Sequence, residues 1–352
     1  MPCSTRHAVI LAAGESKRTR PLTLHRPKPL IPLLDRPLLA HILDELPQGV
    51  ERVTLVVGYR ADQIEATFGA RYRGMALRYA RQALVNGTAG ALLAAAPINE
   101  PFFLLYGDNL VAREDLLGVC AGRYGVAGLH VEDARAFGIL QLEGGQVRGI
   151  IEKPSDPPPD ALANPGIYQL DGAVFPLLAA ITPSPRGELE LTDLIGALAQ
   201  SHAVLPHSCT GFWVPVGTPW EALSAAQFLL ARRPSGAVLI HPQAEVHVTA
   251  RILGPTMIGA GCVVGAGAVV EASMLCAGAS VGAGAHVAAS WLDDGASVGA
   301  GAVLAARAFE ELRPTAETRG QLSRTQLITR GAVLGQGAAV APGASVAPGC
   351  VL

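Results

Sequence analysis

Short apolar runs alternate with helix-like patterns along the first 233 residues. Three runs, each meeting a glycine soon after, predict buried strands: Ala8–Ala12, Arg52–Val57 and Phe102–Tyr106. Three segments have the apolar spacing of helices: Leu38–Leu46, Ala89–Ala96 and Glu221–Arg233. This alternation predicts an α/β domain with a mainly parallel sheet and helices on both faces. Because ligands bind at the carboxyl ends of parallel strands, we expect the chemistry in the loops after Ala12 and Tyr106.

The last third of the chain follows a six-residue period instead. An aliphatic residue, commonly followed by Gly or Ala, recurs at intervals of five or six positions, with one interruption: Ile240, Val246, Ile252, Ile258, Val264, Val270, Leu275, Val281, Val287, Leu292, Val298, Leu304, then Leu334, Val340, Val346 and Leu352. Ser273–Gly284 is also echoed by Ser290–Gly301, 17 residues later (290 − 273). A flexible Gly/Ala-rich tail would not keep its aliphatic residues in register, so the pattern indicates a structural repeat.

Each hexad supplies one short strand with an inward aliphatic side chain, and small residues allow tight corners. The pattern resembles the hexapeptide-repeat left-handed β-helix, a resemblance that implies a homo-oligomer, either a trimer through the β-helix or a higher assembly. Pro234-Ser235-Gly236 separates the two patterns, so we expect one domain over 1–233 and an all-β, parallel β-helix over 237–352. Residues 305–330 interrupt the hexads, and we expect an irregular loop or arm there.

Composition narrows the function. The 352 residues suit two domains, and half of them are hydrophobic, which allows a sizeable core. A net charge of −2 without a basic run argues against nucleic acid or an anionic membrane as a partner. The apolar run near the N-terminus is too short for a signal peptide or a membrane span. Six scattered cysteines without a CxxC pair favour a reducing, cytoplasmic location and argue against zinc.

The loop after the first strand carries groups suited to phosphates. A glycine turn after a strand lets backbone N–H groups approach phosphates, and Arg18 can neutralise the β- and γ-phosphates. Lys28 stands between two prolines, which restrict the backbone and hold this cation in a fixed position. An ordinary strand–loop–helix turn would need neither feature. The two blocks, LAAGxxxRxxPLT at 11–23 and RPKPL at 26–30, resemble the signature of the sugar-1-phosphate nucleotidylyltransferases.

This resemblance implies a Rossmann-like nucleotidyltransferase domain and roles for its residues. Arg18 and Lys28 are then catalytic cations, and the nucleotide is bound by Leu11, Ala13 and Gly14. Ser16 departs from the glycine that many members have, and we expect it to be accommodated with an altered phosphate cradle.

Gln82, followed by Gly87 and Thr88, resembles the nucleotide-binding segment of the family that reads the base. The glutamine amide and the glycine backbone would contact the nucleobase edge. Glutamine here is more usual for uracil or thymine than for guanine, which favours UTP or dTTP. Val85 and Asn86 depart from the commoner pair, so the choice of base stays open.

Asp108 closes the strand that ends at Tyr106. A carboxylate at a strand end beside phosphates suits Mg²⁺, which takes few protein oxygens. A turn-forming Gly-Asp is the alternative, and the order of the motifs favours the metal. The second metal-binding aspartate of the family falls on Pro215, which has no side-chain oxygen. Either Asp108 suffices with phosphate oxygens and water, or another carboxylate substitutes, or the metal site is weak.

Two later segments resemble the sugar-phosphate-binding segments of the family. Gly138 belongs to one; in the other, Glu152 would accept hydrogen bonds from sugar hydroxyls and Lys153 would hold the phosphate. Asn164 stands where some members contact the sugar. Only three lysines occur, Lys17, Lys28 and Lys153, so two of the three fall on motif positions. Arg186–Asp193 matches a further family segment, for which we expect a structural role.

Together these features predict a nucleotidyltransferase that uses Mg²⁺. An oxygen of a sugar-1-phosphate attacks the α-phosphorus of a nucleoside triphosphate, and pyrophosphate leaves. One alternative is a weak or inactive paralogue that binds nucleotide sugars and regulates a partner; Pro215 and Ser16 favour it. Another is a bifunctional enzyme with acetyltransferase activity in the β-helix, for which the last histidine, His286, would have to supply the base.

Overall fold

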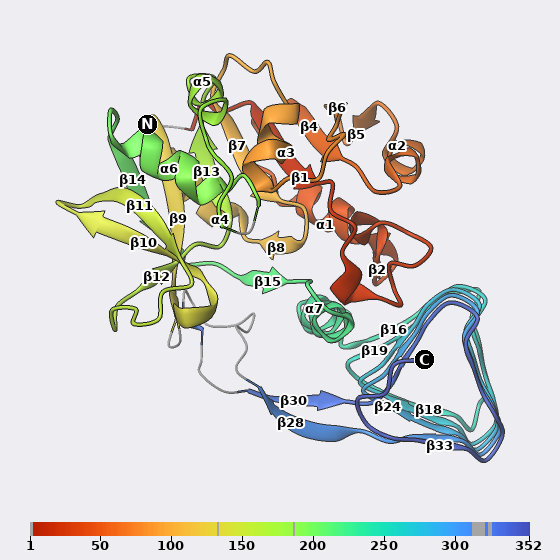
Figure 1. Cartoon of the computed structure of the whole chain (residues 1–352). Helices are drawn as coiled ribbons and strands as arrows, with labels where there is room; N and C mark the ends of the chain where they lie inside the picture. Colours follow the sequence, from red (N-terminus) through yellow and green to blue (C-terminus); the bar gives the residue numbers. More distant parts are fainter. Residues whose placement is uncertain (1–2, 132–133, 186, 312–320, 323–325) are drawn as a thin grey trace. The chain divides into compact units, whose positions relative to one another are not determined.

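The computed structural model describes residues 3–131, 134–185, 187–311, 321–322 and 326–352, and it divides into two compact units (Figure 1). The first unit comprises Met1–Glu15, Leu39–Val214 and Leu312–Arg324. The second comprises Ser16–Leu38, Pro215–Glu311 and Thr325–Leu352. The segment Ser16–Leu38, which follows the first strand and its Gly14 turn, therefore belongs to the unit that contains the hexads.

The first unit is built on a mixed sheet whose centre is parallel. Its order is β11-β10-β12-β9-β13-β7-β1-β4-β6-β5, with β14 and β29 also pairing with β9. Pairing is parallel among β7, β1, β4 and β6, and antiparallel from β7 outward through β13 to β11. The strands are His7–Ala12 (β1), Arg52–Val57 (β4), Arg71–Tyr72 (β5), Met75–Arg81 (β6), Phe102–Tyr106 (β7), Tyr124–Val131 (β9), Gly138–Glu143 (β10), Gln146–Glu152 (β11), Leu162–Ala163 (β12), Ile167–Leu170 (β13), Val204–Ser208 (β14) and Gln321–Leu322 (β29).

Helices and short elements complete this unit. Helix α3 packs on β1 and β4, and α6 packs on β11. The elements are Leu38–Asp44 (α1), Ala61–Phe68 (α2), Thr88–Ala94 (α3), Arg113–Gly118 (α4), Val174–Leu178 (α5), Leu191–Ala199 (α6), the 3-10 turns Val119–Ala121 and Ala134–Ala136, and the paired strands Asn109–Val111 (β8) and Trp213–Pro215 (β15), the last reaching one residue into the second unit.

The predicted elements of the first 233 residues are present. The three apolar runs form β1, β4 and β7, because strands flanked on both sides by neighbours bury both of their faces. Their side chains reach zero exposure in the core around Val9, Phe102 and Leu104. The segments expected to be helical form α1, α3 and α7 (Pro219–Ala231), within a few residues of the predicted limits.

The second unit contains the three-sided parallel β-helix that the hexads predicted, visible in cross-section in Figure 1. Three stacked sheets form its walls: β16-β19-β22-β25-β31, β17-β20-β23-β26-β32 and β18-β21-β24-β27-β33. Their strands are Val238–Ile240 (β16), Glu245–Val246 (β17), Arg251–Leu253 (β18), Thr256–Ile258 (β19), Val263–Val264 (β20), Val269–Glu271 (β21), Met274–Leu275 (β22), Ser280–Val281 (β23), His286–Ala288 (β24), Trp291–Leu292 (β25), Ser297–Val298 (β26), Val303–Leu304 (β27), Val333–Leu334 (β31), Ala339–Val340 (β32) and Ser345–Val346 (β33).

The predicted aliphatic column forms the core of the β-helix. From Ile258 to Val340 its members are at most 7% exposed, whereas Ile240 and Leu352 in the end coils are 43% and 52% exposed. Glycines fill corners where the next coil lies too close for a side chain: a Cβ on Gly282 would lie 2.4 Å from the backbone nitrogen of Ala300. The small residues of the hexads are therefore required by coil stacking.

Three further pieces belong to the second unit. Arg307–Glu311 (β28) and Gln326–Arg330 (β30) pair antiparallel within the stretch where the hexads are interrupted; residues 312–320 and 323–325 lie outside the described chain. Helix α7 donates a hydrogen bond from Gln227 to the Ala272 carbonyl of the β-helix. The segment after β1 contains the 3-10 turns Lys17–Thr19 (η1) and Lys28–Leu30 (η2) and the strands Pro32–Leu33 (β2) and Arg36–Pro37 (β3).

A disulfide joins Cys3 to Cys120, with Cα atoms 5.6 Å apart. The scattered spacing of the cysteines did not predict this pairing. Among the described residues, no helix combines the length and apolar character needed to cross a membrane.

Candidate functional site

The carboxyl end of β1 lies between two glycine turns. The N–H of Gly107 donates to the carbonyl of Leu11 at 2.8 Å. A Cβ on Gly107 would lie 2.9 Å from the Leu11 carbonyl oxygen, and one on Gly58 would lie 2.7 Å from that of Ala13. Glycine is required at both turns, since the backbones approach too closely for a side chain. Gly14, the next residue along the loop, is exposed and faces open space.

The predicted base-reading residues lie together at the end of β6. Gln82 is 8% exposed, and its Nε2 donates to Asn86 Oδ1 at 3.1 Å and to the Gly87 carbonyl at 3.3 Å. Gly87 has a φ of 105°, and a Cβ there would lie 2.4 Å from the Leu189 carbonyl oxygen. Thr88 Oγ1 accepts the backbone N–H of the first residue of α6 at 3.0 Å. The amide of Gln82 is thus oriented by the segment beside it.

The segment expected to be structural, Arg186–Asp193, supports this arrangement. The N–H of Leu189 donates to the Asn86 carbonyl at 2.7 Å, and its carbonyl accepts the N–H of Ala89 at 2.9 Å. These bonds clamp both sides of Gly87. Arg186 itself lies outside the described residues.

Strand register brings the four predicted sugar-phosphate residues together. Gly138 and Glu152 are directly paired across β10 and β11, and a Cβ on Gly138 would lie 2.9 Å from Glu152 Oε2. The N–H of Asn164 donates to the Gly138 carbonyl at 2.8 Å, and that of Lys153 donates to the Phe137 carbonyl at 2.9 Å. Glycine at 138 leaves room for the carboxylate. Glu152 and Lys153 are both exposed.

Two tyrosines lie next to this group. The rings of Tyr106 and Tyr168 meet edge to face with centroids 6.4 Å apart, and Asn164 Nδ2 donates to the Tyr168 hydroxyl at 2.6 Å. Burial raises the pKa of Tyr168 to about 12 and that of Tyr106 well above its usual value. After burial and Tyr168, the charges of Asp108 and Glu152 add to the rise at Tyr106. Both phenols therefore stay neutral near pH 7.

Sequence reasoning did not single out these aromatic residues. Tyr106 ends a predicted strand, and Tyr168 follows Asn164 by four positions, which are only weak signals. Trp213 also belongs here, since its Nε1 donates to the Pro165 carbonyl at 3.1 Å and its ring meets that of Phe137 at 6.2 Å. The aromatic contacts hold the loop between β12 and β13, which carries Asn164.

The predicted cations Arg18 and Lys28 belong to the second unit. Arg18 is exposed, and its Nη2 lies 3.8 Å from the position that a Cβ on Gly217 would occupy. The N–H of Gly217 donates to Glu221 Oε2 at 2.7 Å, so α7 begins beside the guanidinium. Lys28 is 7% exposed and opens η2. Pro215 is partly buried, and it supplies no metal ligand.

Ser16 adopts the backbone conformation that its glycine counterpart would adopt freely. Its φ of 53° and ψ of 55° are left-handed, a conformation that costs a non-glycine residue about 1 kcal/mol or more. Its carbonyl accepts the hydroxyls of Thr19 at 2.7 Å and Thr23 at 3.0 Å. These bonds keep the loop folded despite the departure from glycine.

Comparison with known proteins agrees with both parts of the chain. Residues 7–232 match the nucleotidyl transferase family, and residues 234–352 match the GMPPB C-terminal domain. The fold resembles a UDP-glucose pyrophosphorylase solved with UDP-glucose, at a TM-score of 0.57 and 23% identity, over 65% of this chain and all of that one. This likeness supports the α/β fold.

Two curated relatives carry names of specific enzymes. The bifunctional protein GlmU of Methanocaldococcus jannaschii is 34% identical over 224 residues, which cover 63% of this chain and 54% of that protein. The chain thus spans about half the length of this relative. A glucose-1-phosphate thymidylyltransferase of Streptomyces griseus is 34% identical over 72% of this chain and 78% of its own length. The chain therefore belongs to the nucleotidyl transferase family of enzymes, among its sugar-1-phosphate nucleotidylyltransferases.

Proposed function

We propose that the protein transfers a nucleotidyl group from a nucleoside triphosphate to a sugar-1-phosphate and releases pyrophosphate. The observation that carries the proposal is the grouping of Gly138, Glu152, Lys153 and Asn164 by one strand register. An exposed carboxylate next to an exposed ammonium suits a ligand with both hydroxyls and a phosphate. Glu152 accepts hydrogen bonds from the sugar, Lys153 binds its phosphate, and Asn164 contacts the ring.

The nucleotide is bound at the ends of β1 and β6. Backbone groups of Leu11, Ala13 and Gly14 approach the phosphates, and the Gln82 amide with Gly87 and Thr88 reads the base. The Gln82 amide N–H groups donate to Asn86 and Gly87, which leaves the amide oxygen to accept the imide N–H of uracil or thymine. UTP and dTTP are the favoured substrates for this reason, and the Streptomyces griseus relative is named for thymidylyl transfer.

The two positions at which the family binds a divalent cation, for which Mg²⁺ is the favoured ion, provide one suitable ligand in this chain. Asp108 offers carboxylate oxygens of the kind that Mg²⁺ prefers, and Pro215 offers none. Asp108 is the residue that would hold the ion, which would neutralise phosphate charge. Because Asp108 is the one protein ligand assigned, oxygens of the triphosphate and of water would have to supply the other ligands.

The reaction needs no protein base. The attacking oxygen belongs to a phosphate that is already ionised near pH 7, so catalysis consists of positioning and charge neutralisation. Arg18 and Lys28 stabilise the negative charge that develops on the leaving pyrophosphate. Tyr106 and Tyr168, whose pKa values are raised by burial, act as neutral packing and hydrogen-bonding groups.

Pyrophosphate release tests the proposal. The purified protein is assayed with Mg²⁺ across all common nucleoside triphosphates and a panel of sugar-1-phosphates, beside Asp108→Asn. We expect release that requires both substrates, is fastest with UTP or dTTP, and falls at least about a hundredfold in the variant. If the protein binds nucleotide sugars but releases pyrophosphate with no pair of substrates, the result would contradict the proposal and favour an inactive regulatory paralogue.

Acetyl transfer is a second candidate activity, because one histidine of the β-helix is paired with a carboxylate. His286 Nε2 lies 3.0 Å from Glu271 Oε1, and both side chains are partly exposed on β24 and β21. Such a pair can accept a proton from an amine. The GlmU relative is named bifunctional. Incubation with acetyl-coenzyme A and glucosamine-1-phosphate, beside His286→Gln, tests this activity separately from pyrophosphate release.

A further inference from the structure

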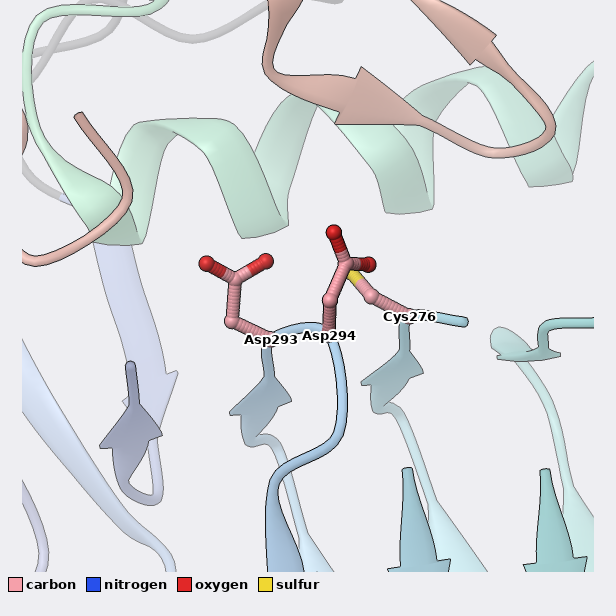
Figure 2. Close-up of side chains that lie close together, drawn as sticks. All are labelled: Cys276, Asp293 and Asp294. Carbon is pink, nitrogen blue, oxygen red and sulfur yellow. The ribbon is translucent and has the colours of Figure 1, made fainter. Parts of the chain in front are cut away.

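One turn of the β-helix carries two adjacent carboxylates where the neighbouring coils carry none. Asp293 and Asp294 follow β25, whereas the aligned turns after β22 and β31 read Cys276-Ala277 and Gly335-Gln336. Figure 2 shows Asp293, Asp294 and Cys276 projecting on the same side from two successive coils. Asp293 is 2% exposed and Asp294 is 39% exposed. The hexad pattern gives these acids no role.

Their partner is Arg26, from the signature block. Its Nη1 donates to Asp293 Oδ1 at 2.8 Å, and its Nη2 donates to Asp294 Oδ2 at 2.5 Å. The guanidinium is itself only 13% exposed. A buried carboxylate is costly unless it is paired, and a guanidinium that engages two carboxylates at once gives strong, directed bonds. Burial raises the pKa of Asp293, and Arg26 opposes that rise.

The guanidinium also decides what this cluster does. A thiol and two carboxylates whose ligand atoms lie within 4.8 Å of one another could bind a metal ion. Arg26 donates to both carboxylates instead, so a cation of the chain itself already neutralises part of their charge. The cluster is therefore an internal ion pair rather than a cation site.

A second contact fastens the same segment to the next coil. A Cβ on Gly335 would lie 2.9 Å from Cβ and 3.2 Å from Cγ of Pro21. Glycine at the turn after β31 therefore lets Pro21 pack against it. Pro21 and Arg26 both lie between Arg18 and Lys28 in the sequence, so both contacts fall within the short stretch that joins these two cations.

We propose that Arg26 is a positioning residue, through which the Asp293–Asp294 turn of the β-helix orders the segment that carries Arg18 and Lys28. The inference rests on the proposed function for its catalytic consequence. Cations that are ordered before the triphosphate arrives do not have to lose conformational freedom on binding. The β-helix then contributes to catalysis without contacting substrate.

Asp294→Asn tests this proposal, because Asp294 is partly exposed and asparagine keeps the size of the side chain while removing its charge. Arg26→Gln is the second variant. Glu51→Gln is the matched control, since it removes one carboxylate from an exposed arginine pair, Arg6–Glu51 at 2.8 Å. Two quantities are measured for each: hydrogen exchange of the backbone amides in residues 20–31, and the steady-state kinetics of pyrophosphate release with UTP, dTTP and the preferred sugar-1-phosphate.

In both test variants we expect exchange in residues 20–31 to rise and kcat/KM for the triphosphate to fall, each by about fivefold or more. The control should change by less than about twofold. Unchanged exchange, or faster exchange with unchanged kinetics, overturns the proposal. A wild-type protein without activity sinks the proposed function alone, and faster exchange in the variants then still establishes the ordering of the segment by the β-helix.

Discussion

Lys153 illustrates how a single residue gains its role from backbone geometry. It follows β11 with a φ of 50°, and its N–H is fixed to the Phe137 carbonyl. The motif predicted a phosphate ligand here. It could not predict that the absence of a side chain at Gly138 leaves space for the Glu152 carboxylate, or that two tyrosines lie beside Asn164. Those relations come from strand register and ring packing, which a motif does not contain.

Lys153→Ala should therefore weaken the sugar-phosphate substrate alone. A charge-assisted hydrogen bond to phosphate contributes about 1.5–3 kcal/mol, so we expect KM for the sugar-1-phosphate to rise at least about tenfold. KM for the triphosphate should change by less than about twofold. Arg148→Ala, at an exposed position of β11, the strand that precedes Lys153, is the control. An equal rise in KM for the sugar-1-phosphate and for the triphosphate would contradict the assignment of Lys153 to the sugar-phosphate subsite.

His7 gives the first unit a pH dependence. Its Nδ1 lies 2.8 Å from Glu100 Oε1 and its Nε2 lies 2.9 Å from Thr54 Oγ1. Burial lowers the His7 pKa below 6.5, although Glu100 opposes the shift. The unfolded chain therefore binds this proton more readily than the folded chain. The contribution of neutral His7 to stability is present above pH 6.5 and is lost as the pH falls through 6.5 toward the folded pKa.

Urea unfolding at pH 7.5 and pH 5.5 tests this dependence. The loss of stability on acidification should be smaller in His7→Gln than in the wild type, because the variant has no imidazole to protonate. The same loss in both proteins would show that other groups carry the acid sensitivity.

Among elements, the β-helix is the part that sequence periodicity predicts best. Each turn depends only on residues a few positions apart, and each aliphatic residue lies above its counterpart in the next coil. The pattern did not reveal that the aliphatic residues of the end coils are about half exposed. It also did not reveal that Arg26 pairs with the two aspartates of the turn after β25. Both depend on what lies next to the coil in space. The Cys3–Cys120 disulfide was missed for the same reason, since its cysteines are 117 residues apart in sequence.

The aliphatic residues of the hexads should contribute unequally to the free energy of unfolding, depending on how deeply each is buried. Leu292 is fully buried, so Leu292→Ala removes packed methyl groups and should lower the free energy of unfolding by about 2–5 kcal/mol. Ile240 has the same hexad position in the first coil but is 43% exposed, so Ile240→Ala should cost less than half as much. Thermal or denaturant unfolding of both variants makes the comparison, and equal losses would contradict a core concentrated in the inner coils.

At the scale of the whole molecule, each compact unit is made of separate stretches of the chain. The expected domain boundary near Pro234 stays a prediction. The composition changes near Pro234, yet Ser16–Leu38 forms one compact unit with α7 and the β-helix. A sequence pattern locates changes in repeat type, whereas unit membership depends on long-range pairs such as Arg26–Asp293. The expected homo-oligomer, a trimer or higher, and the cytoplasmic location stay predictions, which the mass of the assembly in solution and localisation in the cell would test.

The most direct test of the central claim follows two labels through one reaction. The protein is given Mg²⁺, a sugar-1-phosphate and a triphosphate labelled in its α-phosphorus in one sample and in its γ-phosphorus in another. The account predicts that the α-label appears in a nucleotide sugar and the γ-label in pyrophosphate, in equal amounts. Label recovered as nucleoside monophosphate or diphosphate, or left in the triphosphate with every sugar phosphate tested, would contradict nucleotidyl transfer.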